Sequence, residues 1–451
     1  MRALVVLVAG ACASTTACGS SPRGPLDSPE VVPRDETRHY TIWLGGARVG
    51  SATETEDWSR VGVVVRRVET LRFLRGDAPI AMTTTIEIDA DTALIPRFVT
   101  WTERGAQVRS ASARRDGGGW FIDDDSHTGI DARSGVDAGQ RMRLETSKNA
   151  IPAELVPLFV RRDGRFAGEI FLPARGFVGG NGRVDAVTPG RFVAQLELAN
   201  RHDARDARGV GATRVIAEAT IDLGRDGMPA RVVDGEGVIA IRASEVEART
   251  PFELVDLIAA TSIPLSGDRG AHPRLALVGE LALPPVPGQV ASMRAAGLEV
   301  DLSPALPGAM PAGPASADRT REIAALVAHV QQRIAPDLGA AIATPRDASN
   351  ATAGDCTTFA LAYTAVAQRS QIPTKVVTGF RVDRADDGER LVRHRWAVSW
   401  TGTTWIAVDA AFGRAPAGGD LVGLAVHDAD DAGLIAGEAA LAQVHAAAWT
   451  R

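Results

Sequence analysis

The most informative part of the C-terminal sequence is Gly354-Asp-Cys-Thr-Thr-Phe-Ala-Leu-Ala-Tyr-Thr-Ala-Val-Ala367. Its bulky residues, among them Phe359 and Tyr363, recur at helical spacing and predict a helix with one apolar face. Asp355 is a good N-cap, so Cys356 lies in the first helical turn. There the exposed backbone N–H groups and the positive end of the helix dipole stabilise a thiolate. Cys356 is therefore a candidate nucleophile.

The helix alone does not activate Cys356. A free thiol has a pKa near 8.5, and lowering it by about two units requires ~2.7 kcal/mol. The helix dipole supplies roughly 0.3–1 kcal/mol, and the adjacent carboxylate of Asp355 opposes ionisation. We therefore expect a cationic partner such as an imidazolium.

A predicted hairpin further along the chain supplies that partner. Residues 393–400 and 403–409 alternate like strands on either side of Thr401-Gly402. A two-residue loop there places His394 directly opposite Asp409, with Cα atoms about 4.5–5.5 Å apart and both side chains on one face. A three-residue loop would put them on opposite faces. In the first register Asp409 orients the imidazole while its other nitrogen faces the thiol.

Several stretches carry a family resemblance: Gly-Asp-Cys356, Gln368-Arg-Ser-Gln-Ile-Pro373, Lys375-Val-Val-Thr-Gly-Phe380, His394-Arg-Trp396 and Trp405-Ile-Ala-Val-Asp409. In this order they resemble the transglutaminase-like superfamily, whose fold is related to papain-type cysteine proteases, over residues 321–414. The resemblance implies that Cys356 is the nucleophile, His394 the general base and acid, and Asp409 the residue that orients the histidine. It implies attack on an amide bond of a peptide or protein and a thioester intermediate. Resolution by water defines a peptidase or amidase, and resolution by an amine defines an acyltransferase.

The chain also departs from the family pattern. Asp409 is followed by Ala-Ala-Phe412 instead of the common Pro-Thr. The interval between Trp120 and Trp396 contains no tryptophan, so the aromatic oxyanion donor of animal transglutaminases has no counterpart upstream of the cysteine. The backbone N–H of Cys356 is the remaining donor.

Arg393 and Arg395 flank the histidine. We interpret both as solvated residues at a strand edge. The alternatives are that they lower the pKa of His394 or bind a substrate carboxylate.

Residues 39–262 predict an antiparallel β-rich domain with a large curved sheet, because strand-like alternation returns repeatedly between turns. Residues 149–160 read as a helix there, although Pro157 disfavours it. We interpret the domain as a scaffold, with a concave site for an apolar ligand as the alternative. Residues 263–316 read as a Pro/Gly-rich connecting region. We assign residues 317–451 to the transglutaminase-like domain, which begins with a predicted amphipathic helix over 320–334. The predicted fold class of the whole chain is therefore α+β.

The N-terminal sequence predicts an export signal. A positive start and a short apolar run define a signal peptide over residues 1–17. Thr15-Thr-Ala-Cys18 resembles a bacterial lipobox, so Cys18 is a candidate lipidation site and residues 18–38 are the lipidated N-terminus and tether. We expect an exported, membrane-anchored lipoprotein of the cell envelope. Cleavage at Ala11-Cys-Ala13 would instead leave a soluble periplasmic or secreted protein.

Composition limits the remaining functions. The chain has 451 residues and three cysteines, which exclude a disulfide scaffold or a thiolate zinc cluster. Its net charge of −6 argues against a nucleic-acid partner. Asp428-Ala-Asp-Asp-Ala-Gly433 begins like a calcium loop but lacks later ligands, so we expect no metal and no cofactor. The competing hypothesis is a non-catalytic envelope scaffold or binding lipoprotein whose papain-like domain is a docking module.

Overall fold

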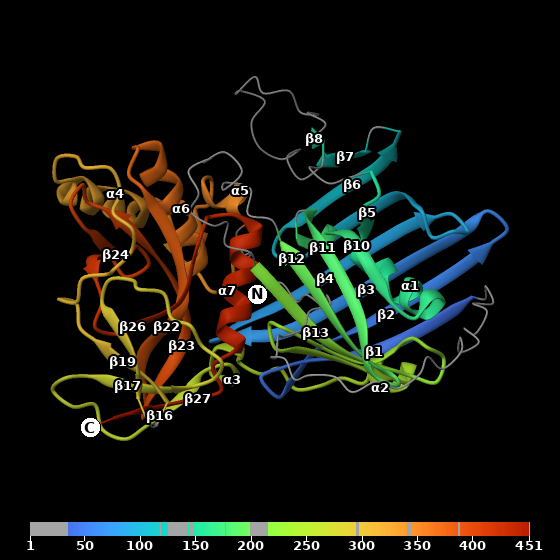
Figure 1. The fold of residues 1–451 in the computed structure, drawn as a ribbon, viewed down its shortest axis with the longest axis horizontal. Helices are drawn as coiled ribbons and strands as arrows, with labels where there is room; N and C mark the ends of the chain where they lie inside the picture. Colours follow the sequence, from blue (N-terminus) through green and yellow to red (C-terminus); the bar gives the residue numbers. More distant parts are fainter. Residues whose placement is uncertain are drawn as a thin grey trace, which may run out of the picture. The chain divides into compact units, whose positions relative to one another are not determined.

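A computed structural model gives the fold of the chain (Figure 1). It describes residues 35–117, 119–124, 142–143, 148–175, 177–198, 215–294, 297–340, 344–386 and 388–450. The predicted export signal, the candidate lipidation site Cys18 and most of the predicted tether lie outside these residues. No helix in the described ranges has the length and apolar character needed to span a membrane.

The chain forms two compact units. The C-terminal unit contains the described residues of Val255–Arg451 together with Phe73–Pro79. The N-terminal unit contains Ile80–Leu254 and the described residues up to Arg72. The short segment Phe73–Pro79 thus belongs to the C-terminal unit, although the rest of that unit begins only at Val255.

The N-terminal unit is dominated by one large curved sheet (Figure 1). Fifteen strands of the described residues form it in the order β8-β7-β6-β5-β4-β3-β2-β1-β15-β14-β13-β12-β11-β10-β9. Neighbouring strands are antiparallel except β9 and β10, which are parallel. The strands are β1 (Glu36–Leu44), β2 (Ala47–Ser59), β3 (Gly62–Arg75), β4 (Ala78–Ala90), β5 (Pro96–Arg104), β6 (Val108–Asp116), β7 (Gly119–Asp124), β8 (Met142–Arg143), β9 (Ile151–Pro152), β10 (Phe166–Leu172), β11 (Val178–Thr188), β12 (Arg191–Leu198), β13 (Val215–Leu223), β14 (Pro229–Asp234) and β15 (Val238–Ala243).

The helix predicted over residues 149–160 is displaced. Its first part contains β9 and the 3-10 turn η2 (Ala153–Leu155), and α1 spans Val156–Asp163. Pro157 lies in the first turn of α1, where the missing N–H costs no helical hydrogen bond. The unit also contains a second 3-10 turn, η3 (Pro173–Arg175), and the short helix α2 (Glu245–Arg249).

The C-terminal unit is built on a ten-stranded sheet of the described residues. Its main path runs β18-β19-β17-β27-β16-β23-β22-β26, and β24 joins β23 and β25. A separate pair is formed by β20 and β21. The strands are β16 (Ile263–Ser266), β17 (Arg274–Val278), β18 (Gln289–Arg294), β19 (Gly297–Leu302), β20 (Ala335–Pro336), β21 (Ala353–Gly354), β22 (Thr374–Ala385), β23 (Gly388–Trp400), β24 (Trp405–Asp409), β25 (Arg414–Ala417), β26 (Leu421–His427) and β27 (Ala446–Trp449).

Residues 263–316, expected as a connecting region, include β16 to β19 of this sheet. Their pairing with β23 and β27 explains why the unit begins at Val255 instead of residue 317. The proline and glycine residues that suggested a connecting region lie mostly between these strands. The strands were missed because local composition does not reveal which strands pair.

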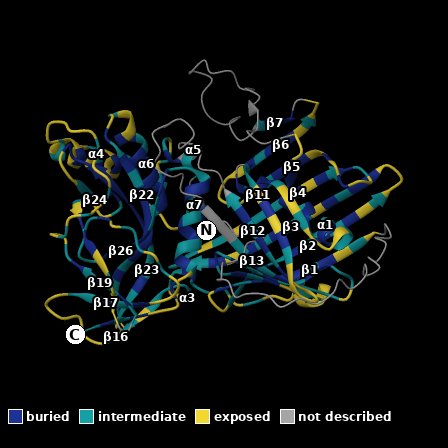
Figure 2. Ribbon diagram, viewed as in Figure 1, coloured by how far each residue is buried: buried dark blue, intermediate teal, exposed yellow. Residues whose placement is uncertain are grey.

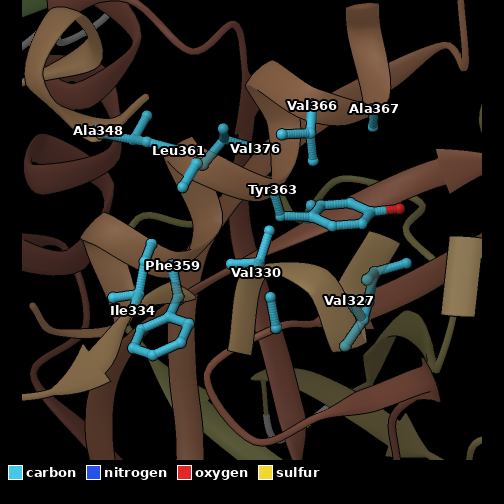
Figure 3. Packing of buried hydrophobic residues seen from close by; sticks show 14 of the residues in the cluster. Val327, Val330, Ile334, Ala348, Phe359, Leu361, Tyr363, Val366, Ala367 and Val376 are labelled. Carbon is cyan, nitrogen blue, oxygen red and sulfur yellow. The ribbon is translucent and has the colours of Figure 1, made fainter. Parts of the chain in front are cut away.

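The helices of this unit in the described residues are α3 (Leu257–Ala260), α4 (Thr320–Arg333), α5 (Pro345–Ala348), α6 (Cys356–Arg369) and α7 (Asp431–Ala442). Of these, α6 packs against β22 and β23, and α7 packs against β22 and β26. The predicted helices over 320–334 and after Cys356 correspond to α4 and α6. Phe359, Tyr363 and Val366 of α6 pack with Val327 and Val330 of α4 in an apolar cluster (Figure 3).

Figure 2 shows the resulting burial, with α6, β22 and β23 largely in the buried class. The Tyr363 hydroxyl lies 2.8 Å from Ser399 Oγ, which lies 2.9 Å from Thr374 Oγ1. This buried hydrogen-bonded chain fixes α6 on β22 and β23, because each hydroxyl would otherwise lack a partner. The position of the N-terminus of α6 is thereby set.

Candidate active site

Cys356 is the first residue of α6, and its neighbour Asp355 caps the helix. Oδ1 of Asp355 accepts hydrogen bonds from the N–H groups of Thr357 at 3.0 Å and Thr358 at 3.2 Å. Asp355 has an extended backbone, as an N-cap requires. The cap therefore begins the helix at the cysteine.

The thiol of Cys356 lies at an edge of β23. β16 pairs with this strand at Arg390 and Leu391, and β24 pairs with it only from Ala397 onward. Between these two ladders the backbone of Arg395 lies near the Cys356 thiol and helps to lower its pKa. The start of α6 thus occupies the interval in which β23 has no strand partner on that edge among the described residues.

The predicted hairpin has a different loop. Trp400 pairs with Trp405, so four residues, Thr401 to Thr404, form the turn instead of two. The side chain of Thr401 stabilises it, because its Oγ1 accepts the Thr404 N–H at 3.1 Å. If this register is continued along the two strands, His394 and Asp409 are diagonal neighbours. The prediction that they lie directly opposite each other is therefore wrong. Adding two residues to a loop preserves the face, because side chains alternate with a period of two.

The structure nevertheless brings the two side chains together. Nε2 of His394 lies 3.0 Å from Oδ2 of Asp409, and His394 and Asp409 are 5% and 0% exposed. His394 also interacts with the Cys356 thiol, and this interaction raises the pKa of the histidine. Because Nε2 is used by Asp409, Nδ1 is the nitrogen left for the thiol.

These contacts change the proton affinity of the pair. Burial alone would lower the pKa of His394, but hydrogen bonds to Asp409 and Cys356 raise it to about 9. Burial alone would raise the pKa of Cys356, but the hydrogen bond and charge of His394 outweigh burial and the like charge of Asp355, so the thiol pKa is lowered. Both directions favour a thiolate beside an imidazolium at neutral pH.

Arg414 is a second partner of Asp409 that the sequence did not reveal. It is the cross-strand neighbour of Asp409 on β25, and its Nη2 donates to Oδ2 of Asp409 at 3.0 Å. Its Nη1 binds both oxygens of Asp420, at 3.0 and 2.8 Å. Burial opposes ionisation of Asp409, but His394 and Arg414 together lower its pKa. The carboxylate is therefore held charged beside the imidazole.

Aromatic rings enclose the imidazole. Trp396 stacks on His394 with ring centroids 6.0 Å apart, and Phe412 meets it edge-on at 5.6 Å. The guanidinium carbon of Arg381 lies 3.9 Å above the Phe412 ring. Phe412 is 49% exposed, so it forms the outer boundary of the site. Neither ring contact is predicted by the local sequence around Trp396 or Phe412.

The interpretation of Arg393 and Arg395 as solvated edge residues is wrong. Arg395 is buried and donates to Glu438 of α7 at 2.5 Å, while Arg393 donates to the same carboxylate at 3.3 Å. Arg395 also donates to Thr357 and Thr378, each at 3.0 Å. Because α7 covers this face of the strand, both arginines link elements of the fold.

His427 lies in the same buried network and stays neutral. Its Nε2 is 2.8 Å from Thr378 Oγ1, and its Nδ1 is 2.7 Å from the Asp428 carbonyl oxygen. A carbonyl oxygen can only accept, so Nδ1 carries the proton, Nε2 of the neutral ring accepts, and the Thr378 hydroxyl donates to it. Burial, with the nearby positive charge of Arg395, lowers the pKa of His427 to about 4.

The segment 428–433, which begins like a calcium-binding loop, forms an ion pair and a helix cap. Asp428 binds Lys375 Nζ at 2.8 Å, and Asp430 caps α7 by accepting the Gly433 N–H at 2.7 Å. Across the parts of the chain that the structure describes, no group of three or more His, Cys, Asp or Glu residues is arranged to hold a metal ion.

Comparison with known families agrees with the position of this site. Residues 310–410 match the family model described as the transglutaminase-like superfamily. The chain thus contains a transglutaminase-like superfamily domain, and the matched segment includes Cys356, His394 and Asp409. No curated protein and no solved structure matches the chain.

Proposed function

We propose that this protein is an exported thiol enzyme that acts on amide bonds of peptides or proteins through Cys356, His394 and Asp409. The observation that carries the proposal is the buried pair of His394 and Asp409, with Nε2 and Oδ2 3.0 Å apart, beside the cysteine at the capped start of α6. The interaction of His394 with the thiol agrees with it. The superfamily match supports the same class of chemistry. The particular reaction is part of the proposal.

In the first step the Cys356 thiolate attacks the amide carbonyl carbon, a C–S bond forms and the carbonyl oxygen becomes an oxyanion. The C–N bond then breaks, and His394 gives its proton to the departing nitrogen. Asp409 keeps the imidazole oriented throughout. The products are a thioester on Cys356 and a free amine or ammonia.

The Cys356 N–H is the proposed oxyanion donor. The next two N–H groups of α6 bind the Asp355 side chain and are therefore occupied. A backbone donor at a helix start needs no reorganisation as charge develops on the carbonyl oxygen.

In the second step a nucleophile attacks the thioester carbonyl and gives its proton to neutral His394, and the thiolate departs. Water yields a carboxylic acid, and an amine yields a new amide. Supplying an amine of increasing concentration separates these outcomes, because only an acyltransferase forms the amide product at the expense of the acid.

Thiol titration tests the proposal before a substrate is known. The rate of iodoacetamide labelling of Cys356 is followed against pH in the full chain, with Cys356→Ala subtracting labelling of the other cysteines. We expect a midpoint below that of a free thiol and a large rise of that midpoint in His394→Ala. His329→Ala, an exposed histidine on α4, is the matched control. An ordinary midpoint that ignores His394→Ala would favour the docking module.

Export and lipid attachment are proposed from the sequence alone. Metabolic labelling with palmitate tests both, since a lipoprotein incorporates label at Cys18 and Cys18→Ala does not. A protein released in soluble form without label would instead indicate cleavage by an ordinary signal peptidase.

A further inference from the structure

The turn between β3 and β4 forms part of the C-terminal unit. The Leu74 N–H donates to the Val255 carbonyl oxygen at 2.9 Å, and the Gly76 N–H donates to Oδ1 of Asp256 at 2.9 Å. Asp256 is itself the N-cap of α3. These two bonds hold the residue between them, Arg75, in a fixed position.

Arg75 contacts the start of α6. Its Nη2 forms an ion pair with Oδ2 of Asp355, and its Nη1 donates to the Leu338 carbonyl oxygen at 3.1 Å. The side chains of Arg75 and Asp355 are 13% and 8% exposed, so water screens the pair little. The two residues are 280 positions apart in the sequence.

The two oxygens of Asp355 have separate tasks. Oδ1 caps α6 through Thr357 and Thr358, and Oδ2 binds Arg75. A cap needs an acceptor but no negative charge, because asparagine caps as well as aspartate. The charge of Asp355 is a disadvantage beside a thiolate, since like charges in proximity disfavour ionisation.

We propose that Arg75 is a positioning residue for Cys356: it holds the ionised Asp355 in place and compensates its negative charge, so that a thiolate can form next to a carboxylate cap. This rests on the proposed thiol chemistry of Cys356. Arg75 acts through Asp355 and does not touch the reacting atoms. The segment Phe73–Pro79, which belongs to the same unit as Cys356, thereby completes the electrostatics of the candidate active site.

The charged groups around the thiol agree with this role. His394 from β23 and Asp355 from the helix cap act directly on Cys356, with opposite effects on its pKa. Burial would raise the pKa of Asp355, but the charge of Arg75 and the Thr358 N–H lower it, so the carboxylate stays ionised. Asp409 and Arg414 lie behind His394 and compensate each other. Arg75 is the cation that compensates Asp355.

Arg75 would make the same contacts if its role were only to stabilise the fold. The experiment therefore measures the ionisation of the Cys356 thiol itself. Iodoacetamide labelling of Cys356 is titrated in the full chain for wild type, Arg75→Ala, Arg75→Lys, Asp355→Asn and the double variant Arg75→Ala/Asp355→Asn. Arg72→Ala is the matched control, because Arg72 is exposed on the same strand. Thermal unfolding of each variant shows that the labelled protein is folded.

Arg75→Ala should raise the labelling midpoint by about one pH unit, which slows labelling about tenfold below the midpoint. Arg75→Lys should restore part of the shift, and Arg72→Ala should leave the midpoint unchanged. Asp355→Asn keeps the cap without the charge, so its midpoint should not exceed that of wild type. In that background Arg75→Ala should have a much smaller effect.

Two results would overturn the proposal. One is an unchanged midpoint in folded Arg75→Ala, which would make the contact a structural clip. The other is an equal shift with and without the Asp355 charge, which would mean that Arg75 does not act through Asp355. Neither result depends on amide cleavage. Failure of the proposed function appears separately, as an ordinary wild-type midpoint that ignores His394→Ala.

Discussion

His394 and Asp409 are diagonal neighbours across β23 and β24, with Nε2 and Oδ2 3.0 Å apart. Diagonal positions on one face of a sheet are about 7–8 Å apart at the backbone, within reach of side chains as long as histidine. Asp409 uses Nε2, so the other ring nitrogen remains for the interaction with Cys356 at the start of α6. The hydrogen bond between His394 and Asp409 therefore requires that both side chains lie on the same face of the sheet, but not that the two residues pair directly.

Replacing Asp409 by Asn should cost amide-cleaving activity about 10²–10⁴-fold, because the imidazole loses the charge that orients it and stabilises its protonated form. The pKa of His394 should fall, because the hydrogen bond and charge of Asp409 raise it. Steady-state rates and labelling titrations measure both effects. Asp420→Asn is the control, because it removes the other partner of Arg414 and leaves His394–Asp409 intact. Equal losses in the two variants would contradict a direct role for Asp409.

The pH dependence should differ between amide cleavage and thiol labelling. The leaving nitrogen needs a proton from the His394 imidazolium, whose pKa is raised from 6.5 to about 9. Cleavage should therefore decline as the pH rises through about 9, whereas iodoacetamide labelling needs only the thiolate and should persist. On the acid side both should decline together as Cys356 is protonated. Parallel alkaline losses would show that His394 is not the acid.

Removing Arg414 should weaken the protein at neutral pH. Arg414→Ala deprives buried Asp409 of one of its two partners, and a lost charged hydrogen bond costs about 1–3 kcal/mol of unfolding free energy. The folded-state pKa of Asp409 is lowered, so its contribution is present above the unfolded pKa of about 3.9 and is lost as the pH falls. The difference from wild type should accordingly narrow in acid. Urea unfolding at several pH values measures it, and Arg384→Ala, which is 84% exposed, should change stability by under about 0.5 kcal/mol.

Gly379 faces His394 across β22 and β23, and its lack of a side chain is required there. A Cβ atom at Gly379 would lie 2.0 Å from the Val422 carbonyl oxygen and 3.0 Å from the Trp396 ring. Because the closest atom is backbone, Gly379→Ala should destabilise the unit by about 1–3 kcal/mol or more. Calorimetry checks this. Gly270→Ala, where a Cβ meets nothing within 4 Å, should be near neutral.

The sequence alone was sufficient for the local features of the site. The Asp355 cap and the spacing of Phe359 and Tyr363 predicted a helix that begins at Cys356, and α6 has that start. Alternation predicted the strands that carry His394 and Asp409. Such features follow from hydrogen bonds and side-chain periodicity among near neighbours, which the order of residues specifies directly.

The distant groups that meet these residues are set by the packing of whole elements. Arg75 reaches Asp355 through a turn fixed by Val255 and Asp256, and Glu438 of α7 binds the arginines beside His394. The four-residue turn set the offset of His394 and Asp409 through the Thr401 side chain. Charge pairing over long sequence separations depends on how whole elements pack. A residue's local pattern therefore specifies its secondary structure and face, whereas its partners are set by the fold.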